Sequence, residues 1–128
     1  MSRQHFRSAL GRAIGLGSAK RGSQHWLVQR VTAVALVPLT LWFVASIVAH
    51  AGSDYRIFIA WLRTPFTSGV MILLLIALFH HIALGLQVVI EDYIHSDARF
   101  VAVIASQLCC YGLAVVGIIA TLRIAFGS

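Results

Sequence analysis

The sequence predicts an all-α membrane protein with three transmembrane helices. The chain has 128 residues, of which 59% are hydrophobic and only 11% are charged, whereas soluble domains carry about 25% charged residues. Three stretches of 23, 27 and 23 residues contain no Asp, Glu, Lys or Arg, at 31–53, 64–90 and 100–122. Roughly 20 residues cross the hydrocarbon core as a helix. In lipid, backbone polar groups must be hydrogen-bonded within the protein, which only helices and closed barrels achieve. The stretches do not alternate apolar and polar residues as barrel strands do, so we expect helices.

Residues 1–30 are predicted to form a basic N-terminal arm on the cytoplasmic side. Six of the ten basic residues precede the first span, so the positive-inside rule places the N-terminus in the cytoplasm. Two interpretations of the arm remain open: a tail with solvated charges, or a segment that contacts anionic headgroups or a partner subunit. We attribute the basic charge to the lipid bilayer and expect no nucleic-acid partner. The arm residues are Arg3, Arg7, Arg12, Lys20, Arg21 and Arg30.

The remaining residues, 31–126, are predicted to form one three-helix membrane anchor. The first span covers about 31–51, and Pro38 should kink it because proline removes a backbone donor. After a short loop, Pro65 suits the first turn of a second helix at about 65–90. The third helix covers about 100–125. With the N-terminus in the cytoplasm, the chain crosses the membrane twice before the loop that precedes this helix, so that loop also lies in the cytoplasm.

His80 and His81 are the residues in the spans most suggestive of chemistry. Ionisable groups at this depth are rare and usually face a bundle interior or a cavity. Gly85 lies one turn beyond His81 on the same face and leaves room for a large flat group such as a porphyrin. Neutral imidazole is an axial ligand of haem iron. The alternative, a histidine that bonds a carbonyl of a neighbouring helix, remains open.

Asp92 and Tyr93 follow at the predicted cytoplasmic end of the second span, ~17 Å from His81 along a helix axis. A tyrosine hydroxyl there can donate a hydrogen bond to a quinone carbonyl, and an adjacent acid can handle protons. The alternatives are an interfacial anchor for Tyr93 and a solvated loop acid for Asp92. Arg30, at the same end of the first span, can fix topology, pair with a haem propionate, or do both.

These residues resemble a known family. The segment His81-Ile-Ala-Leu-Gly85-Leu-Gln87-Val-Val-Ile-Glu91-Asp92-Tyr93 is similar to the HxxxG…DY segment of the succinate dehydrogenase hydrophobic membrane anchor subunit, the D subunit of respiratory complex II. Gln29-Arg30-Val-Thr-Ala and the preceding His25-Trp26 resemble proteobacterial members.

The resemblance implies half of a two-subunit haem-binding helical bundle in the bacterial inner membrane. It implies that His81 is one axial ligand of a haem b shared with the C-subunit cytochrome b anchor. Tyr93 and Asp92 would contribute to the ubiquinone site, and Arg30 would lie near the haem propionates. His80 would point about 100° away from His81, toward the partner anchor.

The implied function is to anchor the complex and to help pass electrons from an iron–sulfur subunit to ubiquinone, the substrate. A flavoprotein subunit would oxidise succinate, so the chain would not be catalytic alone. One alternative is an anchor of another respiratory complex, such as fumarate reductase. Another is a small transporter or assembly factor without a cofactor, although transporters usually show broken helices from repeated halves.

Overall fold

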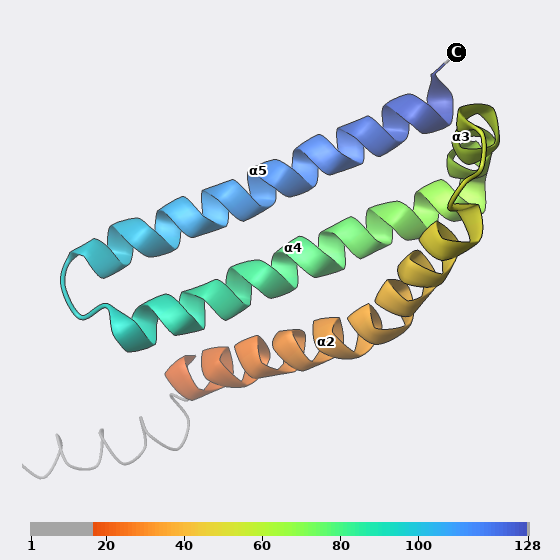
Figure 1. Cartoon of the computed structure of the whole chain (residues 1–128). Helices are drawn as coiled ribbons and strands as arrows, with labels where there is room; N and C mark the ends of the chain where they lie inside the picture. Colours follow the sequence, from red (N-terminus) through yellow and green to blue (C-terminus); the bar gives the residue numbers. More distant parts are fainter. Residues whose placement is uncertain (1–16, 128) are drawn as a thin grey trace, which may run out of the picture.

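The computed structural model describes residues 17–127, and this part of the chain is entirely helical apart from short connections (Figure 1). Its helices are α2 (Gly17–His50), α3 (Tyr55–Arg63), α4 (Pro65–Tyr93) and α5 (Ala98–Phe126). Three segments are long and apolar enough to cross a membrane: Trp26–His50, Pro65–Tyr93 and Ala98–Phe126. The prediction of an all-α protein with three spans is therefore confirmed. Most of the predicted basic arm, residues 1–16, lies outside the described residues.

Helix α2 begins earlier than the predicted first span and continues through Pro38. Its axis changes direction in the second half of the helix, as Figure 1 shows, in keeping with the kink expected from a proline that cannot donate to the helical ladder. The helix ends at His50, and Gly52 turns the chain with a φ of 81°, a conformation that side chains rarely adopt.

The first loop contains a helix, α3, that the sequence analysis did not anticipate. The carboxylate of Asp54 accepts a hydrogen bond from the Tyr55 backbone N–H at 3.2 Å and caps the helix start. Trp61 of α3 packs on His50 at the end of α2, with ring centroids 4.4 Å apart. At the end of α3, Arg63 donates through Nε to the backbone oxygen of Ile124 in α5 at 3.2 Å. Through these contacts, α3 connects the end of α2 to the end of α5.

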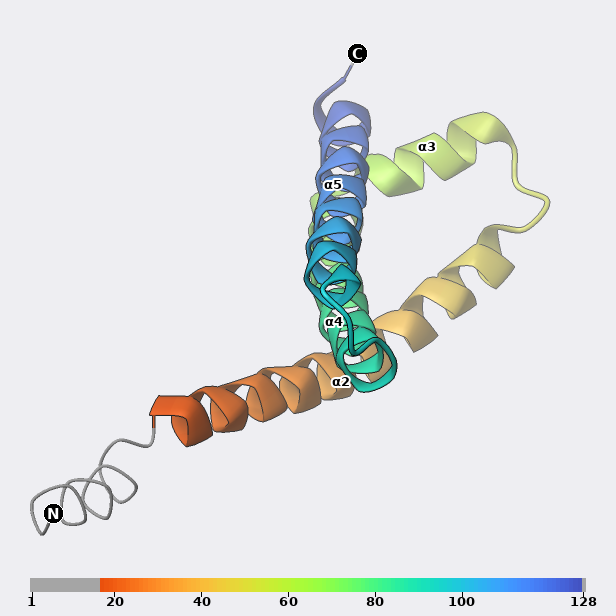
Figure 2. The same ribbon diagram turned by 90° about the vertical axis from the view of Figure 1, so that its left-hand side faces the viewer.

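Helices α4 and α5 form the most closely packed pair, and they run side by side along their lengths (Figures 1 and 2). Small residues permit this approach, as in other membrane bundles. A Cβ placed on Gly117 of α5 would lie 3.1 Å from Cδ1 of Leu75 in α4. The buried residues of the pair include Leu74, Ala83 and Ala114. The core of the chain therefore lies along the α4–α5 seam.

Helix α2 is packed differently, because it contacts α4 but lies across the α4–α5 pair in Figure 2. No residue of its most hydrophobic window is buried within the chain. Apolar side chains such as Val34 and Leu41 remain 71% and 66% exposed. The groove between α2 and α4 contains two of the sequence-predicted residues, His81 and Gly85.

Candidate functional site

His81 lies on the face of α4 that contacts α2. Its Nδ1 is 3.0 Å from the hydroxyl oxygen of Thr32 in α2, and both residues are half-buried. The same hydroxyl can donate to the backbone oxygen of Val28 at 2.8 Å or of Gln29 at 3.0 Å. The ring of His81 therefore faces a neighbouring helix of its own chain. A histidine held through one nitrogen leaves the other nitrogen for a second partner.

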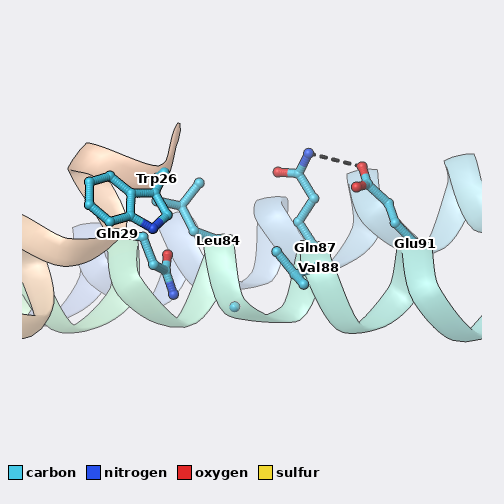
Figure 3. A pocket seen from close by; sticks show the side chains of 7 residues that line it. Trp26, Gln29, Leu84, Gln87, Val88 and Glu91 are labelled. Carbon is cyan, nitrogen blue, oxygen red and sulfur yellow. Dashed lines mark hydrogen bonds between the residues drawn. The ribbon is translucent and has the colours of Figure 1, made fainter. Parts of the chain in front are cut away.

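A cavity of about 570 Å³ opens in the same groove, toward the α4–α5 connection. Gly85 forms part of its wall, and the nearest side-chain atom to a Cβ placed there is Nε2 of Gln29, at 3.9 Å. Figure 3 shows the side chains of Trp26 and Gln29 reaching from α2 over this part of α4. Most of the lining is apolar, and its polar side chains are Gln29 from α2 and Gln87 and Glu91 from α4. The lining residues are Trp26, Gln29, Leu84, Gly85, Gln87, Val88 and Glu91.

Gln29 carries an unsatisfied polar atom at the cavity wall. Its Oε1 is buried and has no hydrogen-bond partner in the described part of the chain. An unpaired buried amide oxygen costs about 1–3 kcal/mol, so such atoms usually mark a place where a water, ion or ligand binds. Rotation of the amide by 180° exchanges its oxygen and nitrogen, and Gln29 can therefore offer either a donor or an acceptor.

Arg30 does not line this cavity, but it contacts a residue that does. Its guanidinium carbon sits 5.4 Å from the centroid of the Trp26 ring, and Trp26 is one of the lining residues. A cation over an indole face is stabilised by the ring quadrupole, so Trp26 restricts where the guanidinium can reach. The structure thus brings two sequence-predicted residues, His81 and Gly85, to one groove, with Arg30 beside it over Trp26.

Asp92 and Tyr93 lie apart from the cavity, at the end of α4. Tyr93 is 80% exposed, and neither residue belongs to the cavity lining. The acid that does line the cavity is Glu91, which the sequence analysis did not select. Both exposed residues remain available to a molecule or subunit that approaches this end of the bundle from outside the chain.

A chain of polar side chains links Glu91 to α5. Gln87 donates through Nε2 to Oε1 of Glu91 at 3.1 Å, and Gln107 of α5 donates to Oε1 of Gln87 at 3.0 Å (the first bond is drawn in Figure 3). Gln87 and Glu91 are four residues apart, the spacing that places two side chains on one helix face. That spacing was visible in the sequence, but only the fold shows that the face borders a cavity.

His80 contacts α5 through one ring nitrogen. Its Nδ1 is 3.1 Å from the hydroxyl oxygen of Tyr111 in α5. The two neighbouring rings therefore contact different helices, as expected, and a contact of His80 with a partner anchor stays a prediction. The neighbouring helix α5 therefore supplies a partner, Tyr111, for one of the two ring nitrogens of His80.

The described residues contain no group of three or more His, Cys, Asp or Glu side chains placed to hold a metal ion. His81 instead offers one imidazole in an apolar groove beside a glycine and a cavity. Three apolar spans with little buried surface, and a groove between two of them, define a multi-pass membrane protein.

Comparison with known proteins identifies the family. The model of the succinate dehydrogenase/fumarate reductase transmembrane subunit family matches residues 4–121, and the chain belongs to this family. The resemblance to succinate dehydrogenase anchor subunits is thereby confirmed.

Three relatives illustrate the likeness, and each is named succinate dehydrogenase hydrophobic membrane anchor subunit. The Rickettsia bellii protein is 41% identical over 104 residues, which are 80% of this chain and 83% of the relative. The Rickettsia conorii protein is 36% identical over 107 residues, 82% and 85% of the two chains. The Paracoccus denitrificans protein is 30% identical over 116 residues, 91% and 90% of the two chains. No solved structure matches the chain.

Proposed function

We propose that this chain anchors a succinate dehydrogenase in the bacterial inner membrane, with its N-terminus in the cytoplasm. In this proposal it helps to bind a haem b and to form the ubiquinone site. Its partners are a C-subunit cytochrome b anchor, an iron–sulfur subunit and a flavoprotein subunit. The relatives described above carry this anchor name. The same family model also covers fumarate reductase, which is the alternative complex.

The observation that carries the haem proposal is the position of His81. Its ring is held by Thr32, in a half-buried groove, and it stands one helical turn from Gly85. A Cβ on Gly85 would meet only Gln29, at 3.9 Å, so this stretch of α4 presents bare backbone to the cavity. A flat macrocycle needs such a surface beside its axial imidazole, and His81 and Gly85 fit one. When bound, the haem would supply one-electron redox chemistry.

The chain's own groups around the cavity also suit the polar edge of a haem. Arg30, beside the cavity, can hold a propionate in a bidentate pair. Gln29 can donate one more hydrogen bond through Nε2. The carboxylate of Glu91, which accepts a hydrogen bond from Gln87 at 3.1 Å, would repel a propionate. The propionates therefore belong on the Arg30 side of the cavity, away from Glu91.

In this proposal a histidine of the partner anchor would hold the haem together with His81. The large apolar area that α2 leaves uncovered supports a partner anchor at this groove. Tyr93 and Asp92 then serve the ubiquinone site from the end of α4. The Tyr93 hydroxyl donates to a quinone carbonyl, and the Asp92 carboxyl exchanges protons with water.

The test is the spectrum of the assembled complex with His81→Ala. We expect the low-spin haem bands of the purified complex to be lost or strongly weakened, because alanine cannot coordinate iron. His80→Ala is the matched control. The imidazole of His80 contacts Tyr111 of α5, so we expect its removal to leave the haem bands in place. Reduced-haem spectra that are unchanged in His81→Ala would refute the assignment. Co-purification with fumarate reductase subunits would favour the alternative complex.

A further inference from the structure

We propose that Thr32 is a positioning residue that fixes the tautomer of His81, so that Nδ1 carries the proton and Nε2 presents its lone pair to iron. This inference rests on the proposed function, because it assigns a role to Thr32 in haem ligation. It is carried by three distances around one hydroxyl group, each of which limits where the single hydroxyl proton can go.

The hydroxyl of Thr32 has one proton to donate and two lone pairs to accept with. It lies 2.8 Å from the backbone oxygen of Val28 and 3.0 Å from that of Gln29. Back-bonding of this kind to a carbonyl three or four residues earlier is a common arrangement for threonine in membrane helices. With the proton directed to a carbonyl, the side of the oxygen that faces α4 is left as an acceptor.

His81 Nδ1 stands 3.0 Å from that acceptor side. A bond there then requires the proton on Nδ1, and a neutral imidazole with a proton on Nδ1 has its free lone pair on Nε2. The opposite tautomer would place a proton on Nε2 and would force Thr32 to abandon both carbonyls in order to donate to Nδ1. Among the two arrangements, only the first keeps the back-bond and leaves a nitrogen able to bind metal.

The side chain of Thr32 is also held rigidly. Two heavy atoms on Cβ restrict its χ1 rotation in a helix, and the back-bond selects the rotamer that points the oxygen toward α4. Metal-bound histidines usually donate their second ring N–H to such an outer partner, which fixes the ring and raises the basicity of the ligand. A more basic imidazole stabilises ferric over ferrous iron. Thr32 should therefore lower the midpoint potential of the haem as well as strengthen its binding.

Thr32→Val in the assembled complex tests the inference, because valine keeps the branched shape and removes the acceptor. We expect about tenfold weaker haem retention, the lower end of the usual effect of losing an outer partner. The midpoint potential of the remaining haem should rise, and its low-spin ferric EPR signal should shift. Thr32→Ser, which keeps the hydroxyl, should restore all three readouts. The control is Thr40→Val, which removes a back-bond to Leu36 on the same helix and should change none of them.

Haem content, midpoint potential and EPR signal that match the wild type in Thr32→Val would overturn the inference while leaving the haem site intact. A wild-type complex without low-spin haem, or one in which His81→Ala retains it, would instead overturn the proposed function and this inference with it. If Thr32→Val does not assemble, the midpoint potentials of Thr32→Cys and Thr32→Ser are compared instead. These two variants differ only in whether sulfur or oxygen accepts the hydrogen bond from His81. Equal potentials in that pair would also refute the role of Thr32.

Discussion

Replacing Gly85 with alanine should make the chain more stable and the haem site weaker. An added Cβ would lie 3.9 Å from Nε2 of Gln29, an ordinary contact distance. The fold can therefore accept the methyl group, and alanine in place of glycine inside a helix gains about 0.5–1 kcal/mol. The same methyl group projects into the space proposed for a macrocycle. Overpacking of about 1–3 kcal/mol there corresponds to roughly 5- to 150-fold weaker haem retention.

Gly117→Ala is the matched comparison, because Gly117 lies in the α4–α5 seam away from the cavity. A Cβ at this position would come within 3.1 and 3.2 Å of the two terminal carbons of Leu75. Overpacking of about 1–3 kcal/mol should outweigh the gain in helix propensity of about 1 kcal/mol, for a net loss of up to roughly 2 kcal/mol. Haem content should stay at the wild-type level as long as the complex assembles.

The two variants are compared in the purified complex by thermal unfolding in detergent and by haem content from reduced-minus-oxidised spectra. The expected pattern is opposite in the two assays. Gly85→Ala keeps or gains stability and loses haem, whereas Gly117→Ala loses stability and keeps haem. Full haem content in Gly85→Ala, at any stability, would show that nothing flat lies beside this residue. A Gly117→Ala complex as stable as Gly85→Ala would contradict the close packing in the seam.

Three further predictions concern other parts of the chain. Tyr93→Phe should slow ubiquinone reduction while succinate oxidation with an artificial acceptor is unchanged, because only the hydroxyl donor is lost; equal losses in both assays would indicate an assembly defect instead. Gln107→Leu removes the hydrogen bond to Gln87 and should destabilise the α4–α5 pair by about 0.6–1.7 kcal/mol. The free energy of unfolding in detergent measures this loss, and an unchanged value would mean that the bond does not contribute to stability. In a background without the native cysteines, Ser96→Cys should react with an impermeant thiol reagent added on the cytoplasmic side. Ser53→Cys should react with the reagent added on the opposite side, and the reverse pattern would contradict the proposed topology.

The three spans could be predicted from the sequence because lipid imposes one requirement on every residue of a span. Charge-free stretches mark the spans directly, and the ends of α4 at Pro65 and Tyr93 lie within a few residues of the prediction. Helix α3 was missed because its charges, Arg56 and Arg63, resemble those of a loop. Its amphipathic pattern and its cap by Asp54 are present in the sequence, yet they indicate a helix only where an apolar surface exists for it to cover.

The candidate site was predictable only in part, for a related reason. His81 and Gly85 were found because an imidazole in a span is costly and a glycine one turn away is informative. Thr32, Gln29 and Glu91 were not found, since each is ordinary in its local sequence and becomes relevant only when α2 lies against α4. Which helices meet, and in what register, depends on contacts between segments that are distant in the chain.

The loose attachment of α2 bears on how the protein matures. Lipid tails are as apolar as the side chains that α2 exposes, so a newly inserted chain has little drive to fix this helix in place. We therefore expect insertion and docking to be separate stages, with contacts to the proposed partner subunits fixing the tilt of α2 after its insertion. If the proposed partner anchor is absent, we expect the three spans still to insert but the chain to be less stable than in the assembled complex.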